Sequence, residues 1–250
     1  MRLGAQFYSI RNHTQTPDGV EDAFREMKEI GYQTVQLSAI CQMDAGELKR
    51  ISEKYALPIV TTHTPAARIL NETDAVIAEH KLFGCPEIGI GSMPPEYHGS
   101  VEGVRNFIKD FTPAMKKIRA AGLRFAYHNH AFEFDDLGGT NAYEILITEM
   151  PDLFFIVDTY WLRYAGQDIE KTIERLKDRI VSVHFKDMAS EPQGAICPCG
   201  DGVIDFQPIL SLCDRLSIPE ALVEQDNAPD TDSYLCMKKS FEGLRSIFGL

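Results

Sequence analysis

The sequence has too few basic residues for a protein that binds a nucleic-acid backbone. It contains 25 lysine and arginine residues against 37 aspartate and glutamate residues, which gives a formal net charge of −12 over 250 residues. Tight binding to phosphates depends on clustered positive side chains. An acidic chain of this size argues against such binding, and we expect no nucleic-acid partner.

The sequence also lacks long apolar runs and an export signal. No apolar run approaches the length that a transmembrane helix needs. The first residues, MRLGAQFYSIRN, do not have the pattern of a secretory signal. The six cysteines are dispersed, which is typical of free thiols in a reducing compartment. We therefore expect a cytoplasmic protein with no membrane partner, and we interpret the CPC at 197–199 as part of a loop.

Short apolar runs alternate with segments of helical periodicity along the whole chain. The expected strands cover residues 2–9, 33–37, 58–62, 87–90, 125–127, 153–157, 180–185 and 221–223. Such alternation indicates parallel strands joined by helical crossovers. Eight repeats in a chain of 250 residues predict a single-domain (β/α)8 TIM barrel that spans residues 1–250. An open doubly wound sheet is the alternative.

Two local signals mark where expected helices begin. Thr16 followed by Pro17 is typical of an N-cap and a first helical residue, and Gly31 is expected to end that helix. The stretch GDGVID at 200–205 has two glycines but lacks the further glycine of a dinucleotide-binding motif. We interpret it as a tight loop that leads to a helix with Asp205 as its N-cap.

Four expected strands end in a potential metal ligand, namely His128, Asp158, His184 and Glu224. In a TIM barrel the carboxyl-terminal ends of the strands meet at one mouth, where active sites lie. Two imidazoles and two carboxylates suit a borderline divalent ion better than Ca²⁺. Mn²⁺, Co²⁺ and Zn²⁺ are ions of this kind. His130 is an alternative to His128, because residues two apart on a strand share a face.

Further residues near these strand ends are candidates for proton transfer. Lys186 shares a strand face with His184 and is suited to stabilise an oxyanion. Glu133 lies between two phenylalanines, and such apolar surroundings raise the pKa of a carboxyl group and suit it to acid–base work. Trp161, the only tryptophan, is expected in a loop that follows Asp158 and is a candidate wall for a sugar ring.

The motifs HNHAFEF, VDTYWLRYAGQD, VHFKDM, GDGVIDFQPIL and LVEQDN follow one another in this order. This series resembles the xylose isomerase-like TIM barrel family of sugar phosphate isomerases and epimerases. The resemblance implies a divalent metal at the barrel mouth, with Mn²⁺ expected first and Co²⁺, Zn²⁺ and Mg²⁺ as alternatives. It also implies a sugar substrate and a homodimer or homotetramer. In ketose 3-epimerases of this superfamily the ligands are Glu, Asp, His and Glu. The last three match Asp158, His184 and Glu224, whereas His128 stands where those enzymes have their first glutamate.

We therefore expect a metal-dependent isomerase or epimerase of a small sugar or keto-sugar. It would abstract a proton beside a carbonyl that the metal polarises and form an enediolate. Glu224, Glu133 and Lys186 are the expected catalytic residues. The expected substrate-binding residues are Gln6, His63, His130, Trp161 and Lys186. Two alternatives remain open: a metal-dependent lyase or dehydratase of a keto-sugar or inosose, since a histidine-rich strand end also resembles the inosose dehydratases, and a non-catalytic sugar-binding barrel or complex subunit.

Overall fold

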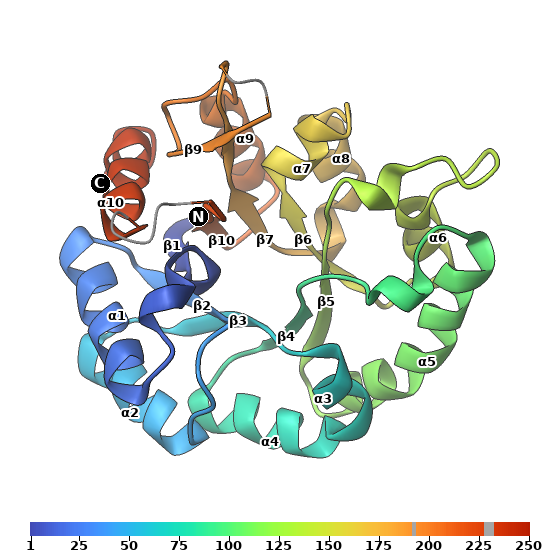
Figure 1. The fold of residues 1–250 in the computed structure, drawn as a ribbon, viewed down its shortest axis with the longest axis horizontal. Helices are drawn as coiled ribbons and strands as arrows, with labels where there is room; N and C mark the ends of the chain where they lie inside the picture. Colours follow the sequence, from blue (N-terminus) through green and yellow to red (C-terminus); the bar gives the residue numbers. More distant parts are fainter. Residues whose placement is uncertain (192–193, 228–232) are drawn as a thin grey trace.

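Eight parallel strands close into a barrel with helices around it (Figure 1). The computed structural model describes residues 1–191, 194–227 and 233–250. The barrel strands are, in ring order, β1 (Arg2–Gln6), β2 (Thr34–Ser38), β3 (Ile59–His63), β4 (Glu87–Ile90), β5 (Arg124–His128), β6 (Phe154–Asp158), β7 (Ile180–Phe185) and β10 (Glu220–Val223). The predicted (β/α)8 TIM barrel is confirmed, and the open doubly wound sheet is wrong because β10 pairs with β1.

The helices lie outside the strands and cover them. They are α1 (Pro17–Ile30), α2 (Ala45–Tyr55), α3 (Ala66–Asn71), α4 (Thr73–Phe83), α5 (Val101–Ala120), α6 (Ala142–Glu149), α7 (Thr159–Tyr164), α8 (Ile169–Leu176), α9 (Phe206–Arg215) and α10 (Ser233–Arg245). Short 3₁₀ helices occur at η1 (Phe7–His13), η2 (Pro95–Tyr97), η3 (Phe132–Phe134) and η4 (Lys177–Arg179). None of the helices in the described ranges is long and apolar enough to cross a membrane.

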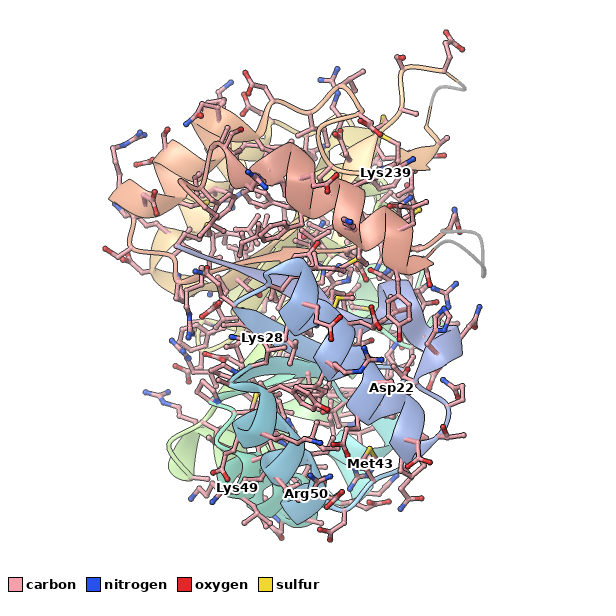
Figure 2. All side chains as sticks on the ribbon, turned by 90° about the vertical axis from the view of Figure 1, so that its left-hand side faces the viewer. Asp22, Lys28, Met43, Lys49, Arg50 and Lys239 are labelled. Atoms are coloured by element: carbon pink, nitrogen blue, oxygen red, sulfur yellow. The ribbon has the colours of Figure 1, made fainter. Side chains whose placement is uncertain are left out.

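Helix α1 shows how local sequence places a helix on the barrel. Thr16 caps it by accepting the N–H of Gly19, and Gly31 ends it in the left-handed region at φ 119°, as the sequence predicts. Val20, Ala23, Phe24 and Met27 of α1 are buried, whereas Asp22 and Lys28 lie on the outer face that Figure 2 shows. This division into an apolar and a charged face drives the helix to pack against the strands.

Two expectations about local structure are wrong. The first strand was expected to reach residue 9 but ends at Gln6, because the Gln6 side chain accepts the N–H of Tyr8 and starts η1. Residues 159–164 were expected to be a loop, but Asp158 accepts the N–H of Trp161 and caps the short helix α7. The side chains at strand ends thus shape the backbone that follows them.

The loop at 200–205 surrounds the carboxylate of Asp187. The N–H groups of Gly200 and Gly202 each donate to Asp187 Oδ2 at 3.0 Å, and that of Ile204 donates to Oδ1 at 3.1 Å. A Cβ on Gly202 would lie 2.3 Å from Asp187 Oδ1, so only glycine allows this close approach. Asp205 then caps α9, as predicted. The two glycines therefore serve a loop that is built around a carboxylate of the protein itself.

The cysteines are free thiols, as the sequence predicts. The CPC stretch is not entirely loop, because Cys197 belongs to a short strand, β9 (Ile196–Cys197), which pairs antiparallel with β8 (Asp187–Met188). This hairpin lies beside the loop that surrounds Asp187 and continues the chain from β7 towards α9.

Replacing Gly31 by alanine should destabilise the barrel more than replacing Gly84 by alanine. Both glycines end a helix at positive φ, which costs an L-residue about 1–2 kcal/mol. A Cβ at Gly31 would lie 2.6 Å from Cζ of Phe241, whereas nothing lies within 4 Å at Gly84. Urea unfolding of both variants measures the difference. Equal losses in the free energy of unfolding would mean that the Phe241 ring moves aside without cost.

Candidate metal centre

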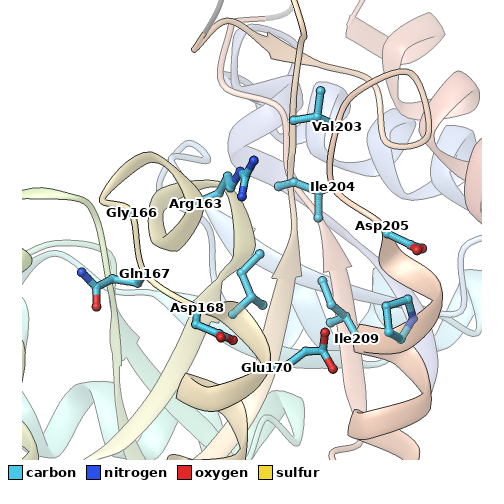
Figure 3. Close-up of a pocket in the computed structure, with 11 residues that line it drawn as sticks. Arg163, Gly166, Gln167, Asp168, Glu170, Val203, Ile204, Asp205 and Ile209 are labelled. Carbon is cyan, nitrogen blue, oxygen red and sulfur yellow. The ribbon is translucent and has the colours of Figure 1, made fainter.

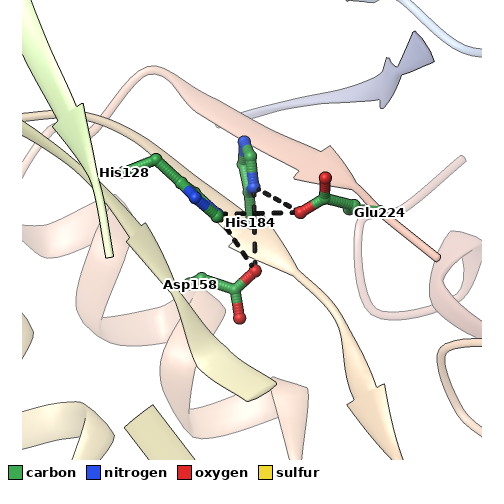
Figure 4. Close-up of side chains that lie close together, drawn as sticks. All are labelled: His128, Asp158, His184 and Glu224. Carbon is green, nitrogen blue, oxygen red and sulfur yellow. Dashed lines mark hydrogen bonds and ion pairs between the residues drawn. The ribbon is translucent and has the colours of Figure 1, made fainter. Parts of the chain in front are cut away.

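Four side chains that the sequence places at strand ends come together at the carboxyl-terminal mouth of the barrel (Figure 4). His128 and Asp158 are the last residues of β5 and β6, His184 lies near the end of β7, and Glu224 follows β10. One nitrogen or oxygen from each lies within 4.8 Å of those from the other three. None of the four residues is more than 3% exposed. Such a buried group could hold a metal ion.

Hydrogen bonds on the far side orient both imidazoles of this group. Nδ1 of His128 donates to the carbonyl oxygen of Gly91 at 3.0 Å, and Nε2 of His184 donates to Oε1 of Gln36 at 2.7 Å. Each ring therefore turns its other nitrogen towards the carboxylates. Metal-binding histidines are oriented in the same way, by an acceptor behind the ring. The donor set and its orientation fit a divalent ion.

The charges of the group also fit a cation. Asp158, Glu224 and the nearby Asp226 bring three negative charges, and Lys186 brings one positive charge. With both histidines neutral, the net charge is −2, which a divalent ion would balance. When no ion is bound, a proton on His184 balances part of this negative charge. Burial lowers the pKa of His184, but the Glu224 and Asp158 carboxylates outweigh it and raise the value to about 9.

Lys186 is held between carboxylates and aromatic rings. It is 1% exposed, and its Nζ lies 2.6 Å from Oδ2 of Asp226, 3.6 Å from Oε2 of Glu224 and 3.9 Å from Oδ2 of Asp158. The ammonium group also lies 4.9 Å from the centre of the Trp161 ring, within cation–π distance. Burial lowers the pKa of Lys186, but these carboxylates raise it above its ordinary value. The side chain therefore stays cationic.

A cavity of about 440 Å³ opens beside the group, within the usual range for small-molecule sites. Its wall includes His128, Glu224, Lys186, His63, His130 and Asp226. A second cavity, of about 500 Å³, lies between the start of α8 and the start of α9 (Figure 3). Its lining contains none of the residues that the sequence predicts for the site. The candidate chemistry therefore belongs to the cavity at the barrel mouth.

Three of the predicted substrate-binding residues lie around this cavity in different ways. His130 lines the wall, and its ring lies 4.8 Å from that of His128. Strand β5 ends at His128, so the strand alternation that made His130 an alternative ligand does not reach it. Trp161 packs against Lys186 and His130, and the centres of the Trp161 and His130 rings lie 5.2 Å apart. Gln6 is buried and reaches the wall through His63.

Glu133 lies outside the group of four and is completely buried in η3. Its two oxygens accept hydrogen bonds from the hydroxyl of Tyr127, at 2.6 Å, and from the N–H of His130, at 2.8 Å. Burial raises its pKa to about 7, in the direction that the apolar flanking residues predict. In this geometry Glu133 fixes the backbone that carries His130.

Three residues near the site were not found from the sequence. Gln36 is a polar residue between two apolar neighbours on β2, and that contrast is a signal that points to it. Gly91 closes β4, and a Cβ there would lie 2.9 Å from Nδ1 of His63. Asp226 lies two residues after Glu224, and its spacing from a candidate ligand is the only signal for it. The contacts of all three depend on strands that are distant in the sequence.

Comparison with known proteins agrees with the fold. The family model described as xylose isomerase-like TIM barrel matches residues 24–224. An inosose dehydratase from Lacticaseibacillus casei is 24% identical over 229 residues, which cover 76% of this chain and 76% of that protein.

Two solved structures share the fold over almost the whole chain. A sugar phosphate isomerase/epimerase from Parabacteroides distasonis has a TM-score of 0.79 at 21% identity and covers 98% of each chain. An L-ribulose 3-epimerase has a TM-score of 0.75 at 16% identity, covering 99% of this chain and 96% of that one. At these identities the two structures establish a common fold.

Elemental analysis of the purified protein should find one divalent ion per chain, and His184→Ala should lose it. Removing one imidazole leaves three protein ligands and weakens the site. His98→Ala is the matched control, because His98 lies outside the group of four. Wild-type protein that takes up no ion even from excess Mn²⁺ would contradict the metal centre.

Gln36→Leu should weaken metal binding by about 10- to 100-fold, although Gln36 is not in the group of four. The substitution removes the acceptor that holds the Nε2–H of His184 and leaves that ring free to turn. Competition with a coloured chelator measures the dissociation constant. Unchanged affinity would mean that the packing around His184 is sufficient to orient the ring.

Glu133→Gln should reduce the pH dependence of stability between about pH 4.5 and 7. In this range the folded protein keeps a proton on Glu133 that the unfolded chain releases, because folding raises the pKa from 4.5 to about 7. The free energy of unfolding of the wild type therefore falls as the pH rises across this window. Urea titrations at several pH values should show a smaller fall in the variant; identical pH profiles would be evidence against a protonated Glu133.

Proposed function

This chain belongs to the xylose isomerase-like TIM barrel family, and we propose that it is a metal-dependent isomerase or epimerase of a sugar or keto-sugar. The observation that carries the proposal is the buried group of two histidines and two carboxylates beside the cavity at the barrel mouth. A divalent ion bound there, with Mn²⁺ as the first candidate, would act as a Lewis acid that polarises a carbonyl group.

Glu224 is the residue that we assign to proton transfer. Of the two carboxylates in the group, Glu224 lines the described wall of the cavity, whereas Asp158 does not. Oε2 of Glu224 contacts Nδ1 of His184 at 2.9 Å and lies 3.6 Å from Nζ of Lys186. It can take a proton from a substrate carbon beside a carbonyl, while the Lys186 ammonium stabilises the negative charge that develops on oxygen.

The remaining predicted residues receive supporting roles in this proposal. His63 and His130 contact the substrate from the cavity wall, and Trp161 keeps Lys186 in place through its ring face. Gln6 acts through His63. Glu133 remains a candidate for acid–base chemistry, but its contacts support a role in positioning His130.

The charge of the cavity supports an unphosphorylated substrate. Lys186 is the one lysine or arginine on the described part of the wall, and it already lies within 4 Å of three carboxylates. The residues outside the described ranges, PQ at 192–193 and APDTD at 228–232, contain no basic residue. A phosphate group would therefore meet no free cation, whereas sugar hydroxyls can bond to the polar wall.

A lyase that dehydrates a keto-sugar or inosose is the second candidate. It is favoured by His128, which leaves Glu224 as the only carboxylate ligand on the described cavity wall, and by the similarity to an inosose dehydratase. The first step would be the same proton abstraction by Glu224. The enolate would then expel a hydroxyl group from the neighbouring carbon instead of accepting a proton at carbon. The hydroxyl group would gain a proton and leave as water.

Glu224→Gln should lower turnover by about 10²- to 10⁴-fold, the usual contribution of a positioned acid–base group. The amide keeps the shape of the side chain but cannot take a proton. Glu170→Gln, in the second cavity, is the control and should keep wild-type activity. A fully active Glu224→Gln enzyme would exclude the assigned role.

Incubation with unphosphorylated ketoses and inososes in D₂O separates the candidate reactions. Deuterium at the carbon beside the carbonyl, in recovered or epimerised sugar, would identify an isomerase or epimerase. A new enone absorbance would identify the lyase. We expect the phosphorylated counterpart of any substrate to react much more slowly, because Lys186 is already paired. If every sugar is unchanged and sugar binding persists without metal, the barrel is a non-catalytic binding protein.

A further inference from the structure

We propose that His63 is a neutral hydrogen-bond donor to a substrate oxygen, with its proton fixed on Nε2 by Gln6, and that it is not a metal ligand. This inference rests on the proposed function for the identity of the substrate and adds to the contact role of His63 its protonation state and the residue that fixes it. The position of the proton follows from the hydrogen bonds around the ring.

The amide of Gln6 can face His63 in one orientation only. Its Oε1 accepts the N–H of Tyr8 at 3.0 Å, which turns the amide nitrogen, Nε2, towards Nδ1 of His63 at 3.3 Å. An amide nitrogen is a donor and cannot accept. Nδ1 of His63 must therefore accept this bond, and the hydroxyl of Ser38, also at 3.3 Å, can donate to it as well.

A neutral imidazole that accepts at Nδ1 carries its proton on Nε2. A doubly protonated ring would turn an N–H group against the amide donor of Gln6, so the contacts also exclude the imidazolium form. Gln6 thus selects one of the three protonation states of His63. This makes Gln6 a positioning residue, because it acts on the substrate through the ring of His63.

Nε2 of His63 is buried and has no hydrogen-bond partner among the described residues. The ring belongs to the cavity wall, and its centre lies 5.0 Å from that of His128 and 5.7 Å from that of His184. Buried donors are normally paired. A substrate oxygen in the cavity would supply the missing acceptor for this N–H group.

Gly91 fixes the position of this ring relative to the candidate ligands. A Cβ at Gly91 would lie 2.9 Å from Nδ1 and 3.0 Å from Cγ of His63, so the absence of a side chain lets the imidazole approach the backbone. The carbonyl of the same residue accepts the bond that orients His128. One backbone segment therefore sets the geometry of both rings.

The same proton position argues against His63 as a further ligand. A histidine binds a metal through an unprotonated nitrogen. Nδ1 of His63 is occupied by Gln6 and Ser38, and Nε2 carries the proton. An uncharged N–H group beside the metal centre is suited to bind an oxygen on which negative charge develops, because it adds a donor without repelling the cation.

The proton position can be read directly by NMR on the Zn²⁺-loaded protein, since Zn²⁺ is diamagnetic. Long-range ¹H–¹⁵N correlation on ¹⁵N-histidine protein should show a protonated Nε2 and an unprotonated Nδ1 for His63, assigned by its loss in His63→Leu. In Gln6→Glu a carboxylate oxygen replaces the amide donor, and Nδ1 should gain a proton. A wild-type ring protonated on Nδ1, or an unchanged spectrum in Gln6→Glu, would overturn the inference.

Metal affinity and turnover of His63→Leu and His63→Gln complete the test. We expect both variants to bind Zn²⁺ within about threefold of wild type, whereas a lost ligand would weaken binding far more. Turnover should fall by about 10²- to 10³-fold in His63→Leu, as for a lost oxyanion donor, and should partly recover in His63→Gln, which keeps an N–H group. Weakened Zn²⁺ binding, or equal turnover in the two variants, would contradict the donor role.

The NMR and metal-binding readouts need no substrate. If they give the expected result while no sugar reacts, the proposed reaction is wrong but the fixed proton on His63 stands. If a sugar reacts but the proton of His63 lies on Nδ1, the inference about His63 is wrong but the proposed reaction stands. The two failures are therefore distinguishable.

Discussion

The buried charges at the barrel mouth constrain the rest of the site. Taking an ion out of water costs several kcal/mol unless other charges and hydrogen bonds compensate it. Here Asp158 and Glu224 are buried together with Lys186, and each lies within 4 Å of that ammonium group. The excess of negative charge would favour a bound cation, and the cavity beside the group would let a small molecule reach it.

The barrel holds these charges in place because each strand is bonded to a neighbour on both sides. Parallel strands bring their carboxyl-terminal ends to one edge, so residues far apart in the sequence meet there without long loops. The groups behind the ligands come from the same scaffold: Gln36 lies on β2, and Gly91 directly follows β4. The ring of strands thus determines which nitrogen of each imidazole faces the carboxylates.

The same arrangement is compatible with more than one reaction of a keto-sugar. Proton abstraction beside a carbonyl needs a base, a stabilised oxyanion and a held substrate, and in the reaction that we propose Glu224, Lys186 and His63 of the wall have these roles. Isomerisation, epimerisation and dehydration differ in what the enolate does next. That choice depends on which groups face the neighbouring carbon.

The sequence by itself determined the alternation of strands and helices, and hence the barrel, because apolar periodicity reflects which face of each element is buried. It also placed His128, Asp158, His184 and Glu224 at one mouth, since strand ends converge in this fold. Only the tertiary structure decided which way the side chains turn. Glu133 bonds to Tyr127 and the backbone of His130, and Asp226 bonds to Lys186, because such contacts depend on distances between distant segments that no local pattern encodes.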